Sequence, residues 1–154
     1  MTKAKLLFSV LLLTSLFSYG QRMNTVDTSI TKLIGDGWHK FSLKGVKYDV
    51  KVMDHRFVRG NIYWLDGATY SGSLGSKGMR GKGTYTWANG LRYEGSMKNN
   101  QRHGKGTLYL KDGSKFTCKW KENKKHGKGT AYNADGKVVK TGVWIEGVLQ
   151  EEVL

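Results

Sequence analysis

Few side chains in this sequence have the type and spacing that catalysis requires. The chain carries 12 acidic residues, and Asp66, Asp112 and Asp135 each precede a glycine, a dipeptide typical of tight turns. Turn formation explains these aspartates, so we do not expect a carboxylate pair for acid–base catalysis. Cys118 is the single cysteine, which excludes an internal disulfide and a multi-cysteine metal site. We interpret its thiol as a small packing group rather than a nucleophile.

Two histidines and the Gly-Lys-Gly triplets also invite a chemical interpretation. His103 and His126 each precede such a triplet, at the position that Arg80 occupies earlier in the chain. Neither has a cysteine or a second histidine close by, so we interpret both as solvated loop residues rather than metal ligands. The triplets lack the Lys-Ser/Thr pair and the following helix of a phosphate-binding loop. We therefore expect no metal, no cofactor and no enzymatic activity.

Basic residues form the most informative pattern. Lys and Arg number 26 against 12 Asp and Glu, which gives a formal charge of +14 and a pI near 9.9. Four of them recur every 23 residues: Arg59, Lys82, Lys105 and Lys128. With two strands per period, at about 4.8 Å each, these cations would stand roughly 10 Å apart in one row. The row predicts an anion-binding strip, although exposed lysines also serve simply to keep proteins soluble and sheet edges unpaired.

The same 23-residue spacing extends to many other positions, which identifies the chain as a repeat protein. It is kept by the glycines of four Asp-Gly or Asn-Gly pairs: Gly67, Gly90, Gly113 and Gly136. Runs of β-forming residues, such as GTYTW (83–87) and LRYEGSM (91–97), flank these pairs, so each unit predicts a β-hairpin. Basic, Gly- and Asn-containing connectors join the hairpins, and we expect them to be solvated loops. Their cations include Arg80, Lys98, Arg102, Lys121, Lys124 and Lys125.

An aromatic column marks one face of the predicted sheet. Because side chains alternate along a strand, Tyr93 and Met97 lie on one face and Glu94 lies on the other. The aromatic face comprises Tyr70, Tyr93, Phe116 and Trp120. These rings could stack on bases or sugars, or they could form the core of a thin sheet. A sheet needs one packed face for stability, which favours the core.

The segment YEGSMKNNQRHGKGTLYLKDG (93–113) resembles the MORN repeat, whose pattern is Tyr-x-Gly-x-Trp, a basic stretch, Gly-x-Gly-Thr and an Asp/Asn-Gly turn. The resemblance covers residues 45–147, with degenerate units at both ends. It departs from the pattern where Cys118 replaces the strand glycine and where Leu74 and Met97 replace the usual Trp. The resemblance implies an all-β, elongated and twisted antiparallel ribbon of hairpins. Such ribbons bind proteins, serve as scaffolds or attach to membranes, with no catalysis of their own.

Length and composition fit one domain of this kind. The chain has 154 residues, which excludes a multidomain enzyme. It has 21 Gly and no Pro, and its 38% hydrophobic and 12% aromatic residues are too many for a disordered protein. The excess of basic residues favours a polyanionic partner, whether nucleic acid, acidic lipid or an anionic polysaccharide.

Residues 1–20 (MTKAKLLFSVLLLTSLFSYG) have the pattern of a secretory signal peptide. Lys3 and Lys5 precede an apolar run from Leu6 to Phe17, and small residues follow. The run has 12 residues, whereas a membrane span needs about 20, so a membrane anchor is the weaker alternative. Cleavage before Gln21 would remove two lysines, lower the formal charge from +14 to +12 and leave no transmembrane helix. We therefore expect a periplasmic or secreted protein.

Two segments flank the predicted array. Residues 21–44 precede it and are candidates for an end cap, which repeat ribbons need, and residues 148–154 follow it as a tail. Four apolar residues fall at helical spacing: Val26, Ile30, Leu33 and Ile34. This spacing predicts a short amphipathic helix as the cap.

Together these features predict a non-enzymatic, extracytoplasmic repeat module for protein binding or scaffolding, with a partner that the sequence does not identify. The alternative is a peripheral binder of acidic membrane lipid or anionic glycan through the basic row. Export weakens the case for nucleic acid.

Overall fold

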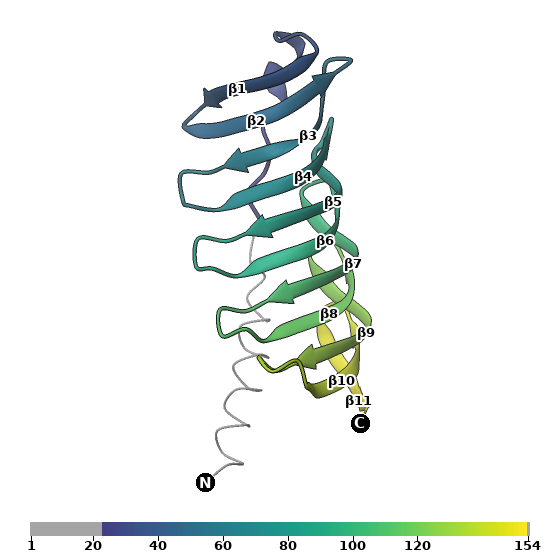
Figure 1. Ribbon diagram of the computed structural model, residues 1–154. Coiled ribbons are helices and arrows are strands. Elements are labelled where there is room, and N and C mark those ends of the chain that lie inside the picture. Colours follow the sequence, from purple (N-terminus) through teal and green to yellow (C-terminus); the bar gives the residue numbers. More distant parts are fainter. Residues whose placement is uncertain (1–22, 154) are drawn as a thin grey trace.

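The structure, a computed structural model, describes residues 23–153 and contains one antiparallel sheet of 11 strands. The strands follow chain order, so each pairs with its neighbours in sequence and the sheet forms an elongated, twisted ribbon (Figure 1). The strands are β1 (Gly37–Leu43), β2 (Val46–Met53), β3 (Arg56–Tyr63), β4 (Thr69–Gly75), β5 (Gly78–Thr86), β6 (Arg92–Lys98), β7 (Gln101–Tyr109), β8 (Lys115–Lys121), β9 (Lys124–Tyr132), β10 (Val138–Ile145) and β11 (Val148–Val153). The predicted all-β ribbon of antiparallel hairpins is confirmed. The predicted signal peptide, residues 1–20, lies outside the described residues.

Two kinds of turn alternate along the ribbon from β2 onward. The Asx-Gly pairs lie in three-residue loops, in which, for example, Gly90 has a φ of +85° and its N–H donates to the carbonyl of Trp87 at 2.9 Å. The connectors instead close with two-residue turns such as Asn99-Asn100, where φ is +50° and +63°. The prediction that the connectors are loops is therefore wrong. In KNNQRH (98–103), all residues except the turn pair belong to β6 or β7.

A tyrosine that packs on a glycine joins neighbouring strands in the inner units. The ring of Tyr93 on β6 lies over Gly106 on β7, where a Cβ would collide with the ring and its hydroxyl. The Tyr93 hydroxyl donates a hydrogen bond to the carbonyl of Ser96 at 2.9 Å. Tyr70 lies over Gly83 in the same way. The second glycine of each Gly-Lys-Gly triplet therefore leaves room for the aromatic ring of the preceding strand.

The strands bend at β-bulges that recur once per unit. The register shifts between Gly72 and Leu74 in the pairing of β4 with β5, and between Gly95 and Met97 in the pairing of β6 with β7. Bulges bend a strand and increase its twist, and in Figure 1 the right-hand ends of β5, β7 and β9 curve behind the front of the ribbon. We call the face that carries the buried aromatic column the inner face, and the opposite face the outer face.

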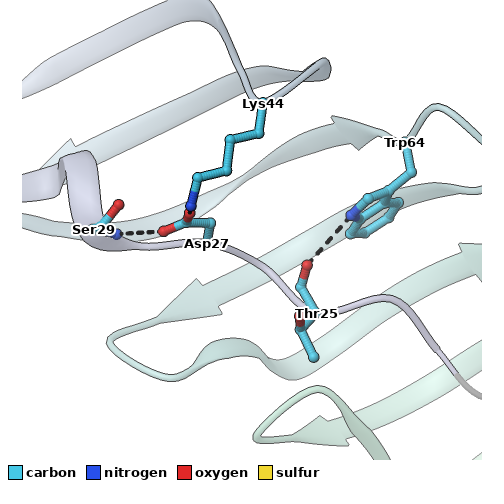
Figure 2. Close-up of polar contacts among 5 residues, drawn as sticks. All are labelled: Thr25, Asp27, Ser29, Lys44 and Trp64. Carbon is cyan, nitrogen blue, oxygen red and sulfur yellow. Dashed lines mark hydrogen bonds and ion pairs between the residues drawn. The ribbon is translucent and has the colours of Figure 1, made fainter.

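The N-terminal segment, residues 23–34, lies along the inner face. Met23 and Val26 are buried, with exposed fractions of 4% and 7%. The Asn24 N–H donates to the Tyr85 hydroxyl at 3.0 Å. The Trp64 indole N–H donates to the carbonyl of Thr25 at 3.3 Å, as Figure 2 shows. These contacts make the segment a cover for the first part of the core.

An ion pair ties the same segment to the first two-residue turn. The Asp27 carboxylate accepts the backbone N–H of Ser29 at 2.9 Å and pairs with Lys44 Nζ at 3.0 Å (Figure 2). The hydrogen bonds from Ser29 and Lys44 lower the pKa of Asp27 from 3.8 to about 2. The carboxylate is thus charged at all but strongly acidic pH.

The amphipathic helix predicted for this segment is wrong. A single 3₁₀ turn, η1 (Ser29–Lys32), is the only helical element of the described residues, and Leu33 is 84% exposed. The backbone N–H of Val26 bonds to the side chain of Asn100 at 3.4 Å instead of to a carbonyl of its own segment. An extended segment whose polar groups bond to the sheet does not need helical hydrogen bonds, and its apolar residues insert singly into the core.

The sheet extends beyond both predicted limits of the repeat array. β1 lies within the segment assigned to the cap, and it pairs with β2 from Gly37 opposite Val52 to Leu43 opposite Val46. The predicted tail contains β11, which pairs with β10. Hairpin pairing thus continues where the repeat pattern in the sequence has faded.

Candidate binding face

The four repeated cations lie on the outer face, opposite the aromatic core. All four side chains are exposed, and each comes from an odd-numbered strand between β3 and β9. Their cross-strand partners are Lys51 and Ser73 for Arg59, Ser96 for Lys82, Lys119 for Lys105 and Val143 for Lys128. None of these partners is acidic, and Lys51 and Lys119 add further cations. We call Arg59, Lys82, Lys105 and Lys128 the basic strip.

A row of hydroxyl side chains runs beside the basic strip. On β5, β7 and β9 its threonine lies two residues after the lysine of the strip. Cross-strand pairing joins Ser71 to Thr84, Thr107 to Thr117 and Thr117 to Thr130. Glu94 interrupts the row between Thr84 and Thr107, and its carboxylate forms an ion pair with Arg92. The outer face thus offers hydroxyl groups next to positive charges, with one carboxylate that is already paired.

Shallow hollows bring these two rows together. One hollow of about 450 Å³ is lined by Lys82, Lys105 and Lys128 together with the threonines at 107, 117 and 130. Backbone at Gly95, Gly106 and Gly129 also lines it, so the surface is low between the lysines. A second hollow of about 310 Å³ holds Arg59 and Lys82. All four residues of the strip therefore border hollows on one face, which is the arrangement that an elongated anionic ligand requires.

An exposed tryptophan stands at the β1 end of this face, and the sequence patterns did not single it out. Trp38 is 55% exposed and lines the second hollow. The guanidinium carbon of Arg59 lies 5.5 Å from the centre of its ring. Trp38 lies in the segment that was assigned to the cap, where a strand was not expected. Side-chain alternation along WHKF (38–41) indicates that Trp38 and Phe41 lie on opposite faces of a strand.

The predicted aromatic face forms the core and presents no binding surface. Its four residues are almost fully buried, with exposed fractions of 1% for Tyr70, 0% for Tyr93, 2% for Phe116 and 3% for Trp120. Burial raises the pKa of both tyrosine hydroxyls above the ordinary value of 10.0. Tyr93 and Trp120 pack edge to face with ring centres 5.7 Å apart. Stacking of a ligand on these rings would require the core to open.

Two of the connector cations, Arg102 and Lys125, are buried on the inner face, contrary to the prediction of exposed loop charges. Their exposed fractions are 5% and 7%. The Arg102 guanidinium carbon lies 4.2 Å from the ring centre of Trp120, and its Nη2 donates to the carbonyl of Asn123 at 3.0 Å. Burial lowers the pKa of Arg102 from 12.5 to about 10. Both cations occupy the repeat position at which Met79 is buried, one unit before Arg102 and two units before Lys125.

The remaining candidates for chemistry give no catalytic arrangement. Burial is the main cause that raises the pKa of the Cys118 thiol from 9.0 to about 12, so the thiol stays protonated and is a poor nucleophile. His126 Nδ1 is buried and has no hydrogen-bond partner. Within residues 23–153 there is no cluster of three or more His, Cys, Asp or Glu side chains that could hold a metal ion. No helix in this described part of the chain is long and apolar enough to cross a membrane.

Comparison with known proteins agrees with the repeat geometry. The model of the MORN repeat matches three successive segments, residues 76–92, 93–115 and 119–138. These segments span the region from the turn before β5 to the start of β10, where the tyrosine–glycine packing and the basic strip are most regular. No curated protein sequence matches the chain.

Proposed function

Since the chain belongs to the MORN repeat family, we propose that it is a non-enzymatic binding module that acts outside the cytoplasm and holds or scaffolds a protein partner. Repeats of this family generally bind proteins or membranes. The observation that carries the proposal is the basic strip, in which four exposed cations border hollows on one face. A rigid sheet presents such charges in fixed positions, so it can recognise a surface of complementary charge.

The outer face is the side proposed to meet the partner. The inner face is occupied by the core and, over its first part, by residues 23–34. On the outer face, Lys82, Lys105, Lys119 and Lys128 lie in and around one hollow. We therefore expect the partner to carry acidic groups along a matching length.

Partner capture tests this proposal. The chain from Gln21 onward serves as bait in the envelope fraction of its native cell. A strip variant changes Lys82, Lys105 and Lys128 to Gln, and a matched control changes three exposed lysines elsewhere, Lys98, Lys111 and Lys137. Loss of the same protein from the strip variant alone supports the proposal. Equal capture by all three chains, or equal loss from both variants, contradicts a role for the strip.

Export is proposed from the signal-peptide pattern of residues 1–20. The intact mass of the protein recovered from the native envelope fraction tests it. We expect a chain that begins at Gln21. A mass that includes Met1 would contradict the localisation.

Acidic lipid is a second candidate ligand, because a row of lysines is also attracted to an anionic membrane surface. Such attraction is worth about 1 kcal/mol for each basic residue and is screened over about 8 Å at physiological ionic strength. Sedimentation with acidic vesicles that depends on the strip and disappears as salt rises would favour lipid. Capture of a protein that persists at high salt would favour the adaptor function.

A further inference from the structure

We propose that the outer face binds a linear anionic polysaccharide, which lies across the strands along the basic strip and ends with a sugar ring on Trp38. The inference rests on the binding function proposed above and names the class of ligand for the same face. Three features of this face point to a glycan rather than to a flat acidic surface: the spacing of the cations, the hydroxyl row in the hollow, and the exposed tryptophan.

The spacing of the cations suits a chain with regularly placed acidic groups. Lys82, Lys105 and Lys128 follow one another at intervals of two strands, which is roughly 10 Å. A linear polyuronate carries one carboxylate on each sugar, and two of its sugars span a similar length. Every second carboxylate would then meet one lysine per hairpin, and the carboxylates between them would add to the overall attraction. Lys119, which pairs with Lys105 across the strands, adds a second cation at the centre of the row.

The floor of the hollow can form hydrogen bonds with sugar hydroxyl groups. Thr107, Thr117 and Thr130 are half-buried beside the lysines and line the 450 Å³ hollow with backbone at Gly106 and Gly129. A flat bilayer or protein surface that rests on the lysines would not reach these recessed hydroxyl groups, of which that of Thr117 donates a long hydrogen bond to the carbonyl of Thr130 at 3.4 Å. A chain one sugar wide fits between the lysines, and its hydroxyl groups can exchange hydrogen bonds with the threonines.

Trp38 supplies an apolar platform at one end of the row. Among residues 23–153 it is the one large aromatic ring that is more than half exposed on this face, at 55%, and it shares its hollow with Arg59, Asn61 and Lys82. A ring that is bordered by an arginine, an amide and a lysine offers a stacking surface next to polar groups. Sugar rings bind to such surfaces through their C–H groups, while their acidic and hydroxyl substituents reach the polar neighbours.

Glu94 allows a test in which removal of a negative charge should raise the affinity for the ligand. Its carboxylate lies in the hydroxyl row and lines the same hollow as Lys82 and Lys105. It would repel an acidic chain, so Glu94→Gln should strengthen binding, whereas Lys105→Gln should weaken it. Each change is about fivefold in affinity at low ionic strength, the value expected for one charge near an acidic ligand.

The experiment measures binding of the mature chain to polygalacturonate, a linear polyuronate, by titration calorimetry and tryptophan fluorescence. Poly-glutamate of the same charge, a neutral linear glucan, a single-stranded oligonucleotide and acidic vesicles are the comparison ligands. The variants are Lys105→Gln, Glu94→Gln, Trp38→Ala and Trp38→Phe, with Lys111→Gln as the matched control. Near-UV dichroism verifies that each variant is folded.

We expect polygalacturonate to bind more tightly than poly-glutamate. Trp38→Ala should weaken the polyuronate alone, by several-fold, and Trp38→Phe should restore part of the loss. Equal binding of both polyanions with no effect of Trp38→Ala overturns the inference, as does tighter binding of the oligonucleotide or the vesicles. If polygalacturonate does not bind but strip-dependent protein capture persists, the inference falls and the proposed adaptor function stands. If both are absent, both fall.

Discussion

Lys125→Met should stabilise the protein at neutral pH, and the gain should fade as pH rises. Lys125 is 7% exposed, and its Nζ lies 5.1 Å from the ring centre of Phe116 and 5.6 Å from that of Trp144. Burial, with smaller contributions from Arg102 and Lys140, lowers the pKa of Lys125 from 10.5 to about 8. Met79 fills the equivalent position two units earlier with 0% exposure. The site therefore accepts a methionine, and the ammonium group is the costly part of the side chain.

The sign of the pH dependence follows from these two pKa values. Between pH 8 and 10.5 the unfolded chain binds more protons at this lysine than the folded chain does, so wild-type stability rises with pH in that window. The full difference corresponds to at most about 3 kcal/mol. The loss of the cation–π contacts offsets about 1 kcal/mol of this. We expect the free energy of unfolding of Lys125→Met to exceed that of the wild type by about 1–2 kcal/mol at pH 7. This difference should disappear by pH 10.5.

Denaturant unfolding followed by tryptophan fluorescence at pH values between 7 and 10.5 measures the difference. The titration of the buried tyrosines cancels when the two proteins are subtracted. Burial raises the pKa of Cys118 to about 12 even though Lys125 lowers it, so the thiol stays protonated up to pH 10.5 in both folded proteins. The exposed Lys137→Met is the control and should show no pH-dependent difference. A variant that is less stable than the wild type at pH 7, or a difference that does not change with pH, would refute the reasoning about the buried ammonium group.

Three further predictions concern the repeat. Gly106→Ala should destabilise the protein by about 1–3 kcal/mol, measured by denaturant unfolding, because its Cβ collides with Tyr93; an unchanged midpoint would contradict the packing. Asn123→Ala should cost about 1–3 kcal/mol in the same assay, since the buried Arg102 loses its side-chain acceptor and its backbone N–H loses a 2.9 Å bond. Deletion of residues 90–112, one whole period, should leave a shorter folded ribbon with native near-UV dichroism from its tryptophans. Global unfolding of that deletion would indicate a single cooperative core instead.

The repeated part of the fold could be predicted from the sequence because its information is local and periodic. Asx-Gly pairs between β-forming runs define each hairpin, and the alternation of Tyr93 with Glu94 separates core from outer face. The spacing of Lys82 and Lys105 then places the cations on the outer face of successive hairpins. None of these steps requires knowledge of contacts between distant residues.

The buried cations were missed although a signal was present. Alternation continues backward from the buried Leu108 through Gly106 and Gly104 to Arg102, which places Arg102 on the inner face. Met79 in the same repeat position points to the same conclusion. The basic, Asn-rich composition of residues 98–103 predicts a loop, whereas the alternation, when it is continued through them, predicts a strand. Because the turn takes up only Asn99 and Asn100, the rest of this segment belongs to strands β6 and β7.

The N-terminal segment could not be predicted in the same way. Its backbone bonds to side chains far along the chain, as when Asn24 donates to Tyr85, 61 residues away. Helical spacing of its apolar residues is a local signal, and contacts with the completed sheet override it. The sequence of residues 23–34 alone contains no trace of those contacts.

The measurement that tests the binding face most directly is a lysine-labelling footprint of residues 21–154 with and without the partner captured in the experiment proposed above. An amine-reactive reagent is quantified at each exposed lysine by mass spectrometry. We predict that Lys82, Lys105 and Lys128 lose reactivity when the partner binds, whereas Lys111 and Lys137 keep theirs. Protection of Lys111 and Lys137 with an unchanged basic strip would contradict the outer face as the site of binding.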